Sequence, residues 1–374
     1  MIGIITFHGS HNHGSMLQAY ATQQAIQKLG YDSEIINFRM QSQKDYYTLY
    51  QTKYGAMRFF RGLLLLPIHR PRSDRFLKFE NFLNKRYKLS GSELNTYNDL
   101  KSVCSKYDCY LSGSDQIWSS LIPELVGSSV DYSGVYFLDF VQKGKRKISY
   151  ASSIGESRFE DLQSKKKYLE DYDRISTREE KGSKIIETIV HKKVSTVIDP
   201  TLLLNKEDWR RISGDPIINE RYILLYTLQG IRTGIKWAKK LKKLSKRFNL
   251  SIVAVSPFFP IIYPGIKTLI NVGPEDFINL IDNAELVFTD SFHGTAFSIN
   301  LGKPFYSMTK KGSEDNRKKN LLKLVGLDNR CIEDFESLDS IDDYTINYKI
   351  PDEKLELCRN ESLNYLIEAL GKRY

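Results

Sequence analysis

A chain of 374 residues with 41% hydrophobic and 12% aromatic residues is long enough for two packed domains, and this composition excludes a disordered protein. The net charge of +10 leaves three classes of anionic partner: nucleic acid, an anionic membrane surface or a phosphorylated small molecule. Because no nucleic-acid motif and no basic-aromatic repeat accompanies this charge, we expect no nucleic-acid partner.

Membrane spans, secretory signals and metal sites have sequence patterns that we do not find here. No apolar run approaches the ~20 residues of a membrane span, and no basic region precedes the first apolar run. The four cysteines form no CxxC pair, and few cysteines in a long chain suit a reducing compartment. We therefore expect a cytoplasmic protein with no metal and no bound cofactor.

Residues 1–40 have the pattern of a strand, a polar loop, a helix and a second strand, which is a βαβ unit. Ser15 and Gln18 fit a capping box, so we expect the helix to begin there. The loop before it holds Asn12 and Gly14, and backbone N–H groups in such a turn can bind an anion or a sugar hydroxyl. Both residues are therefore candidates for substrate binding.

Two histidines, His11 and His13, flank Asn12. A His-x-His pair can bind metal, but no third ligand is in register. Loop histidines are more often surface residues, and we expect the same of these two.

Residues 40–100 interrupt the alternation with a basic segment, which we interpret as an inserted helical region. It is either a solvated helical pair that covers the sheet or a surface that rests on anionic lipid. The second interpretation predicts that replacing Arg58, Arg61, Arg70 and Arg72 with Gln weakens binding to anionic vesicles.

Four later apolar runs each end in small or ionisable residues: 108–112 before 113–118, 146–151 before 152–155, 174–177 before 178–180, and 194–198 before 199–201. Because the carboxyl ends of parallel strands meet at one edge of a sheet, this repetition predicts a ligand site there. It makes Asp115 and Arg178 candidate site residues. Asp199, which precedes Pro200, we interpret as a turn residue.

A linker near residues 205–220 divides a first α/β domain, residues 1–205, from a second, residues 206–340. The second domain alternates again, with helices predicted at 235–248 and 274–283. Residues 341–374 combine an acidic segment with a terminal helix, which we expect to pack back on the first domain.

The stretch 285–305 holds a strand, a tight turn and a helix. The strand Leu286 to Thr289 runs into Asp290 to Gly294, and a helix-like run follows. This arrangement places His293 over the carboxyl end of a sheet, where free helix N–H groups favour anions. The alternative is that Ser291 caps the helix and His293 merely packs.

The ordered segments Asn12-x-Gly14, 113–118, 149–155, 176–179, 199–203 and 289–299 resemble the polysaccharide pyruvyl transferase family. The resemblance covers residues 1 to about 330. It implies an α/β fold with two Rossmann-like domains facing across a cleft, as in GT-B glycosyltransferases. It also implies transfer of the pyruvyl group of phosphoenolpyruvate, the donor substrate, onto two hydroxyls of a sugar, with formation of a ketal and release of phosphate. The expected acceptor is a lipid-linked oligosaccharide precursor of capsule, exopolysaccharide or cell wall.

One position departs from the family pattern, which has an Arg-x-His pair at the turn of the second domain. His293 matches the histidine, but Ser291 stands at the arginine position. Another cation must then neutralise the donor, unless the donor itself has changed. The candidates are Arg178, Lys303, Lys310, Lys311 and Arg317.

Ketal formation needs acid–base groups and a site that holds phosphate. We predict His293 and Asp115 as the catalytic residues, since a histidine and a carboxylate can exchange protons with the reactants. Arg178 can grip a carboxylate or phosphate with two parallel bonds. The full set of predicted substrate-binding residues is Asn12, Gly14, Arg178, Ser291, Gly294, Thr295, Lys310 and Arg317.

Two other functions stay open. A GT-B-type glycosyltransferase that uses a sugar nucleotide would share the fold, and the serine at position 291 leaves room for it. A catalytically silent scaffold in a polysaccharide assembly complex would not need His293. For the pyruvyl transferase and for the glycosyltransferase alike, the basic net charge allows peripheral contact with the inner face of an anionic membrane.

Overall fold

The first domain is built on a parallel sheet. The computed structural model describes residues 1–49, 66–120, 133–257, 259–309, 317–333, 338 and 341–371. The strands β1 (Ile2–Ile5), β2 (Ser33–Ile35), β3 (Cys109–Ser112) and β4 (Arg146–Ser149) have the spatial order β2-β1-β3-β4. Two more strands, β5 (Ile175–Thr177) and β6 (Val194–Thr196), extend this sheet, because Thr177 pairs with Ser152 just beyond β4. Every residue of β1 and β3 is buried, as expected of parallel strands covered by helices on both faces.

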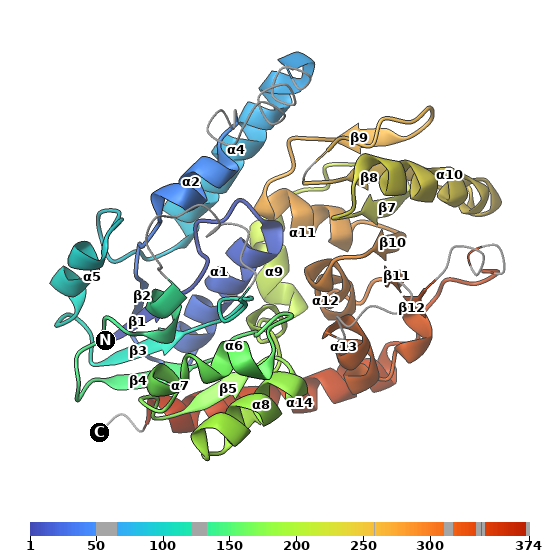
Figure 1. The fold of residues 1–374 in the computed structure, drawn as a ribbon. Helices are drawn as coiled ribbons and strands as arrows, with labels where there is room; N and C mark the ends of the chain where they lie inside the picture. Colours follow the sequence, from blue (N-terminus) through green and yellow to red (C-terminus); the bar gives the residue numbers. More distant parts are fainter. Residues whose placement is uncertain are drawn as a thin grey trace.

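Helices and short 3₁₀ turns connect these strands, and η4 and α9 follow the last of them (Figure 1). In chain order they are α1 (His13–Lys28), α2 (Gln41–Tyr47), η2 (Leu66–Ile68), α4 (His69–Arg86), α5 (Tyr97–Val103), η3 (Ser133–Phe137), α6 (Phe159–Gln163), α7 (Lys166–Leu169), α8 (Glu180–Val190), η4 (Pro200–Leu202) and α9 (Lys206–Ser213).

The second domain has a six-stranded parallel sheet of order β12-β11-β10-β7-β8-β9. Its strands are β7 (Tyr222–Tyr226), β8 (Ser251–Val255), β9 (Lys267–Leu269), β10 (Leu286–Thr289), β11 (Phe305–Met308) and β12 (Cys331–Ile332). Its helices are α10 (Ile231–Phe248), α11 (Pro274–Asp282), α12 (Phe292–Asn300), α13 (Arg317–Val325) and η5 (Asp328–Arg330). Both domains are Rossmann-like, which confirms the predicted α/β fold class.

The terminal helix α14 (Lys349–Leu370) runs back to the first domain (Figure 1). The Tyr365 hydroxyl donates to the Ser149 carbonyl at 2.8 Å, at the end of β4. The Ser362 hydroxyl accepts a bond from the backbone N–H of Ile198 at 3.1 Å. These contacts hold α14 against the first domain, while the domain boundaries at 205 and 340 stay predictions.

The first helix begins earlier than predicted. Asn12 is the N-cap of α1, and its side chain accepts a bond from the Gly14 N–H at 3.0 Å. The predicted capping box at Ser15 and Gln18 is therefore wrong. Gln18 Nε2 donates instead to Thr6 Oγ1 at 2.8 Å, which ties α1 to the end of β1.

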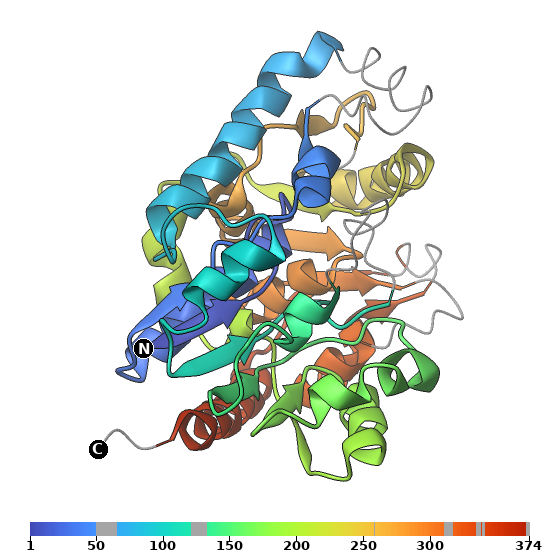
Figure 2. The same ribbon diagram turned by 60° about the vertical axis from the view of Figure 1, so that its left-hand side comes forward.

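Within the described residues the basic insertion contains α4, a long helix that projects beyond the first domain (Figures 1 and 2). Lys78 and Arg86 pair with Asp276 and Glu275 of α11, at 2.6 and 2.7 Å. These pairs attach the insertion to the second domain. Of the four arginines proposed for lipid contact, Arg58 and Arg61 lie outside the described residues, Arg70 is exposed, and Arg72 donates to the Leu49 carbonyl at 2.8 Å.

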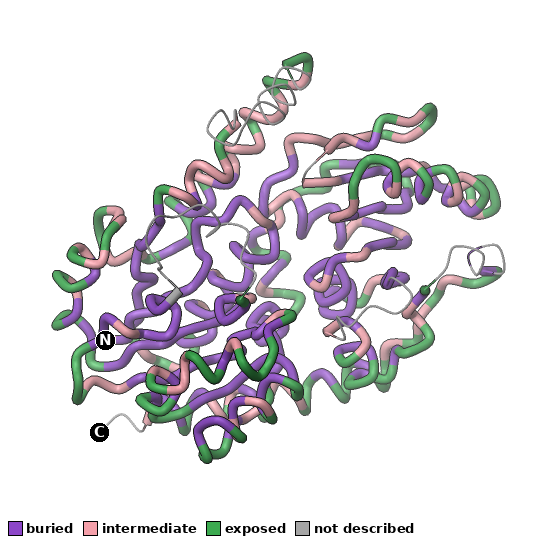
Figure 3. The backbone as a smooth tube through the Cα atoms, in the orientation of Figure 1, coloured by how far each residue is buried: buried purple, intermediate pink, exposed green. Residues whose placement is uncertain are grey.

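Burial follows this layered architecture: the central strands β1, β3, β7 and β10 are buried, whereas the outer sides of α4 and α10 are exposed (Figure 3). None of the described helices combines the length and the apolar character needed to cross a membrane.

Candidate active site

Side chains of the turn between β10 and α12 hold its shape. Ser291 is the N-cap of α12, and its Oγ accepts a bond from the Gly294 N–H at 3.2 Å. The Asp290 carboxylate accepts a bond from the Leu228 N–H at 2.8 Å, which ties the turn to the end of β7. A methyl group on Gly294 would come within 2.4 Å of Thr289 Oγ1, so only glycine fits there.

His293 lies where the N-termini of two helices from different domains meet. Its imidazole packs on Gly14 at the start of α1, where a methyl group would come 2.0 Å from His293 Nδ1. The peptide dipoles of α1 and α12 both direct partial positive charge toward this point. A place between two helix N-termini is suited to an anion.

Asp199 connects His293 to the first domain. Its Oδ2 lies 2.7 Å from Arg178 Nη1 and 3.7 Å from His293 Nε2, and its Oδ1 accepts a bond from the Thr201 hydroxyl at 2.7 Å. Burial alone would raise the pKa of Asp199. The contacts with His293, Arg178 and Thr201 outweigh burial and hold the pKa well below its usual range. Asp199 is therefore ionised at neutral pH.

The Arg178 side chain is 3% exposed and sits in an acidic and aromatic setting. Its Nε lies 3.4 Å from Glu179 Oε1, and its guanidinium carbon lies 4.5 Å from the centroid of the Phe292 ring. Burial would lower the pKa of Arg178, but Asp199, Glu179 and Asp115 raise it above its usual range. The guanidinium is therefore a fixed positive charge.

Three polar atoms around Asp199 are buried and lack a hydrogen-bond partner among the residues that the structure describes. They are Arg178 Nη2, Glu179 Oε2 and His293 Nε2. An unpaired buried polar group costs about 1–3 kcal/mol, so three in one place make this the candidate binding site.

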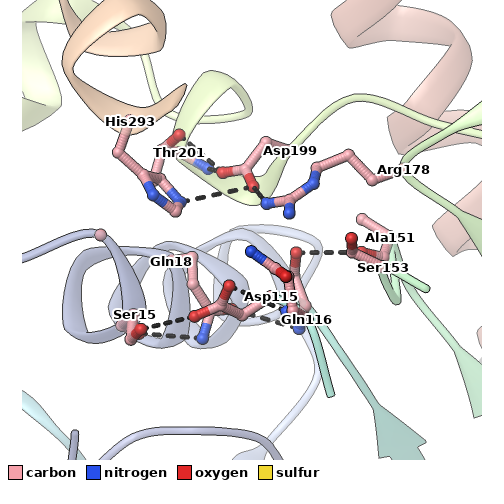
Figure 4. Close-up of polar contacts among 12 residues, drawn as sticks. Ser15, Gln18, Asp115, Gln116, Ala151, Ser153, Arg178, Asp199, Thr201 and His293 are labelled. Atoms are coloured by element: carbon pink, nitrogen blue, oxygen red, sulfur yellow. Dashed lines mark hydrogen bonds and ion pairs between the residues drawn. The ribbon is translucent and has the colours of Figure 1, made fainter. Parts of the chain in front are cut away.

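Asp115 faces Asp199 and Arg178 across this site (Figure 4). Its φ of 71° lies in the left-handed region, which non-glycine residues rarely adopt. The carboxylate accepts bonds from the Ser15 hydroxyl and, at 2.8 Å, from the Gln116 N–H. These bonds hold Asp115 in position at the end of β3.

A family model for polysaccharide pyruvyl transferase matches residues 12–310, which is most of the chain. The chain belongs to this family. It is therefore a transferase of polysaccharide biosynthesis, and the family implies a polysaccharide acceptor. The matched range includes Asn12, Asp115, Arg178 and His293. A search of curated protein sequences finds no match.

Solved structures similar to this pyruvyl transferase have the GT-B-type fold. UDP-GlcNAc 2-epimerase from Neisseria meningitidis, bound to UDP-GlcNAc, is 11% identical with a TM-score of 0.53, over 99% of this chain and 98% of that one. UDP-N-acetylglucosamine 2-epimerase from Rickettsia bellii is 10% identical with a TM-score of 0.52, over 98% and 95%. At such low identity the likeness establishes the fold alone, two Rossmann-like domains that face each other.

The other predicted site residues of this pyruvyl transferase lie in different places. The Thr295 hydroxyl donates to the Ser291 carbonyl at 3.0 Å and contacts Ser307 Oγ at 2.8 Å, so it holds the turn together. Lys303 follows the C-terminal end of α12, at the far end from His293. Arg317 begins α13, whereas Lys310 and Lys311 lie outside the described residues.

Two site-related features were not predicted. His11 and His13 are buried, which makes the surface interpretation wrong. His11 Nε2 donates to Glu80 at 2.7 Å, and His13 Nε2 donates to the Val272 carbonyl at 3.0 Å. Burial lowers the pKa of His13 to about 3, so its imidazole is neutral. The bond from His13 to Val272 joins the two domains. The Asp-Pro pair in the sequence predicts only a turn role for Asp199 and does not indicate its bond to Arg178.

Changing Gly14 to Ala should lower the transfer rate of this enzyme by about 100-fold, because a new methyl group would displace the imidazole of His293. The fold should persist, since alanine favours helices more than glycine does. Steady-state kinetics and thermal unfolding would measure both effects. Gly230→Ala is a matched control, because among the described residues no atom beyond its immediate neighbours in the chain lies within 4 Å of a methyl group there. Equal activity in the two variants would contradict the contact between Gly14 and His293.

Proposed function

We propose that this enzyme transfers the pyruvyl group of phosphoenolpyruvate onto two hydroxyls of a sugar in a surface-polysaccharide precursor. The observation that carries the proposal is that two buried nitrogens, Arg178 Nη2 and His293 Nε2, have no hydrogen-bond partner among the described residues and lie by the N-termini of α1 and α12. Phosphoenolpyruvate carries a carboxylate and a phosphate, and these are the groups that a guanidinium and helix N-termini attract. The family assignment supports the same donor.

In this proposal Arg178 takes the place of the family arginine that Ser291 replaces. Arg178 Nη1 is bonded to Asp199, but Nη2 has no partner among the described residues and can donate to the donor carboxylate or phosphate. The positive charge that binds the donor would then belong to a residue of the first domain, whereas the family arginine lies in the second domain. Ser291 is then left with the cap of α12.

The reaction divides into steps that balance in atoms and charge. Carbon 3 of the enol phosphate gains a proton, and one sugar hydroxyl adds to carbon 2 and loses its proton. The bond between carbon 2 and the phosphate oxygen then breaks, and the second hydroxyl adds and loses its proton. Of the two protons released, one replaces the proton used at carbon 3 and the other leaves with phosphate.

Two side chains are placed to move these protons. His293 Nε2, 3.7 Å from the ionised Asp199, can carry a proton to the departing phosphate, and Asp199 stabilises the charged imidazole. Asp115, on the opposite side, can accept a proton from a sugar hydroxyl. General acid–base steps of this kind typically contribute about 10²–10⁴-fold to the rate.

We further propose that the acceptor is a lipid-linked oligosaccharide and that the enzyme works in the cytoplasm, in peripheral contact with the inner face of the membrane. The resemblance to polysaccharide pyruvyl transferases favours such an acceptor, and an acceptor on a lipid carrier would be met at a membrane. The basic net charge of +10 favours an anionic membrane surface.

Release of phosphate tests the proposed donor. The enzyme, given phosphoenolpyruvate and a model galactoside or a lipid-linked acceptor, should release phosphate and form a pyruvyl ketal that mass spectrometry detects. If the enzyme neither releases phosphate nor binds phosphoenolpyruvate, the proposal is contradicted. Thermal stabilisation by a uridine or guanosine diphosphate sugar, with none by phosphoenolpyruvate, would favour a glycosyltransferase instead.

A further inference from the structure

One strongly charged surface lies outside the site: the outward side of α10. The helix carries eight basic residues and no acidic one. Five of the basic residues recur at spacings of four, three, four and three, so they form one stripe along the helix. All five are exposed: Arg232, Lys236, Lys239, Lys243 and Lys246. We call this set the α10 stripe.

The α10 stripe points away from the protein core. The opposite side of the helix is buried against the second sheet through Gly234, Trp237, Ala238, Leu241 and Leu244. The stripe is therefore fixed in direction by packing and presents a row of positive charge to whatever lies outside.

An exposed apolar side chain lies beside this helix. Ile262, in the segment between β8 and β9, is 72% exposed. Its neighbour Ile261 packs on Gly234, where a methyl group would come 3.0 Å from the isoleucine side chain. Lys242 Nζ lies 5.0 Å from the ring centroid of Tyr263. The two residues next to Ile262 in the chain thus both contact α10. Ile231, at the start of the helix, is a second exposed apolar side chain and is 41% exposed.

The cations of α4 offer a contrast. Arg75 donates to the carbonyls of His11 and Pro257, while Lys78 and Arg86 pair with carboxylates of α11. These three basic residues are used to attach the insertion to the rest of the protein. The five residues of the α10 stripe are all exposed and lie in one row, so the stripe is the better candidate for contact with an external anion.

We propose that the α10 stripe, together with Ile262, docks on an anionic lipid bilayer. A row of lysines gains attraction from anionic headgroups, and an exposed isoleucine whose neighbours contact the same helix gains from the apolar boundary just below them. A nucleic acid would match the charge but would gain little from the exposed isoleucine. The inference extends the proposed function, because a lipid-linked acceptor would be met at this surface.

Sedimentation with vesicles tests this surface without donor or acceptor, so its outcome is independent of the proposed reaction. The wild-type protein should bind vesicles that contain phosphatidylglycerol, should bind pure phosphatidylcholine weakly, and should release at high salt. Replacing Lys236, Lys239, Lys243 and Lys246 with Gln should weaken binding about tenfold or more.

A matched variant separates location from net charge. It replaces four exposed lysines elsewhere, Lys143, Lys193, Lys206 and Lys349, with Gln. It should bind vesicles as the wild type does, and equal loss in both variants would overturn the proposal.

A third variant, Ile262→Ser, keeps all charges and changes only a side chain that is mostly exposed, so it should fold. It should weaken binding to vesicles but not to transfer RNA. Full vesicle binding by Ile262→Ser, or a wild type that prefers RNA to vesicles, would also overturn the proposal.

Discussion

Changing His293 to Gln should lower kcat for pyruvyl transfer by about 10²–10⁴-fold, because glutamine cannot carry a proton to or from the reactants. His293 Nε2 is buried, lacks a hydrogen-bond partner in the described part of the chain, and lies 3.7 Å from Asp199 Oδ2. The KM for phosphoenolpyruvate should change much less than kcat, since Arg178 would still hold the donor. Initial rates of phosphate release over a range of donor concentrations would separate the two constants.

His69→Gln is the control, since His69 is exposed at the start of α4. It should retain full activity. If His293→Gln keeps full activity and polysaccharide modification in cells, the catalytic assignment is wrong and a silent scaffold becomes the better interpretation.

Changing Asp199 to Asn should lower the free energy of unfolding by about 3 kcal/mol or more, because the buried Arg178 guanidinium would lose its closest carboxylate. Transfer should fall as well, since Asp199 positions both Arg178 and His293. Denaturant titration and phosphate-release kinetics would measure the two effects. Asp282→Asn is a matched control, because Asp282 pairs with an Arg210 side chain that is 45% exposed, and such a pair contributes at most about 1 kcal/mol.

The effect of Asp199→Asn should also depend on pH in a defined direction. The pKa of Asp199 is lowered in the folded protein, so its contribution is complete above the unfolded carboxyl pKa of about 4 and is lost as pH falls through the folded value. The difference in stability between wild type and variant should therefore be constant above about pH 5 and narrow at lower pH. A difference that widens in acid would contradict the ionised state of Asp199.

The strand, turn and helix around His293 could be predicted because local residues determine them. An apolar run leads into Ser291, which caps α12, and Gly294, whose position admits no side chain. Arg178 and Asp115 could be predicted as site candidates for a related reason, since both follow apolar runs and parallel strands end at one edge.

The contacts between those elements could not be predicted. Gly14 and His293 lie in different domains, and nothing in either local sequence specifies the partner. The polar loop predicts that His11 and His13 lie at the surface, but α4 and the second domain bury them. Phe79 lies near both rings, and Glu80 is bonded to His11. Asp199 does cap η4, as its turn sequence indicates, yet its bonds to Arg178 depend on tertiary packing.

The site holds more carboxylates than cationic side chains, so binding of an anionic donor is the claim that most needs a test. Three carboxylates, on Asp115, Glu179 and Asp199, stand near Arg178 and His293. A trianionic donor can bind there only if Asp199 stays paired and the two helix N-termini add their partial positive charge. The function proposed for this site therefore depends on phosphoenolpyruvate being held by Arg178.

Calorimetric titration of the protein with phosphoenolpyruvate tests that claim most directly. We expect saturable binding to the wild type and loss of binding in Arg178→Gln. Binding should be retained in Arg210→Gln, because Arg210 is also paired with an aspartate but lies at the surface. No binding of phosphoenolpyruvate to a folded wild-type protein that binds a uridine diphosphate sugar would contradict the account.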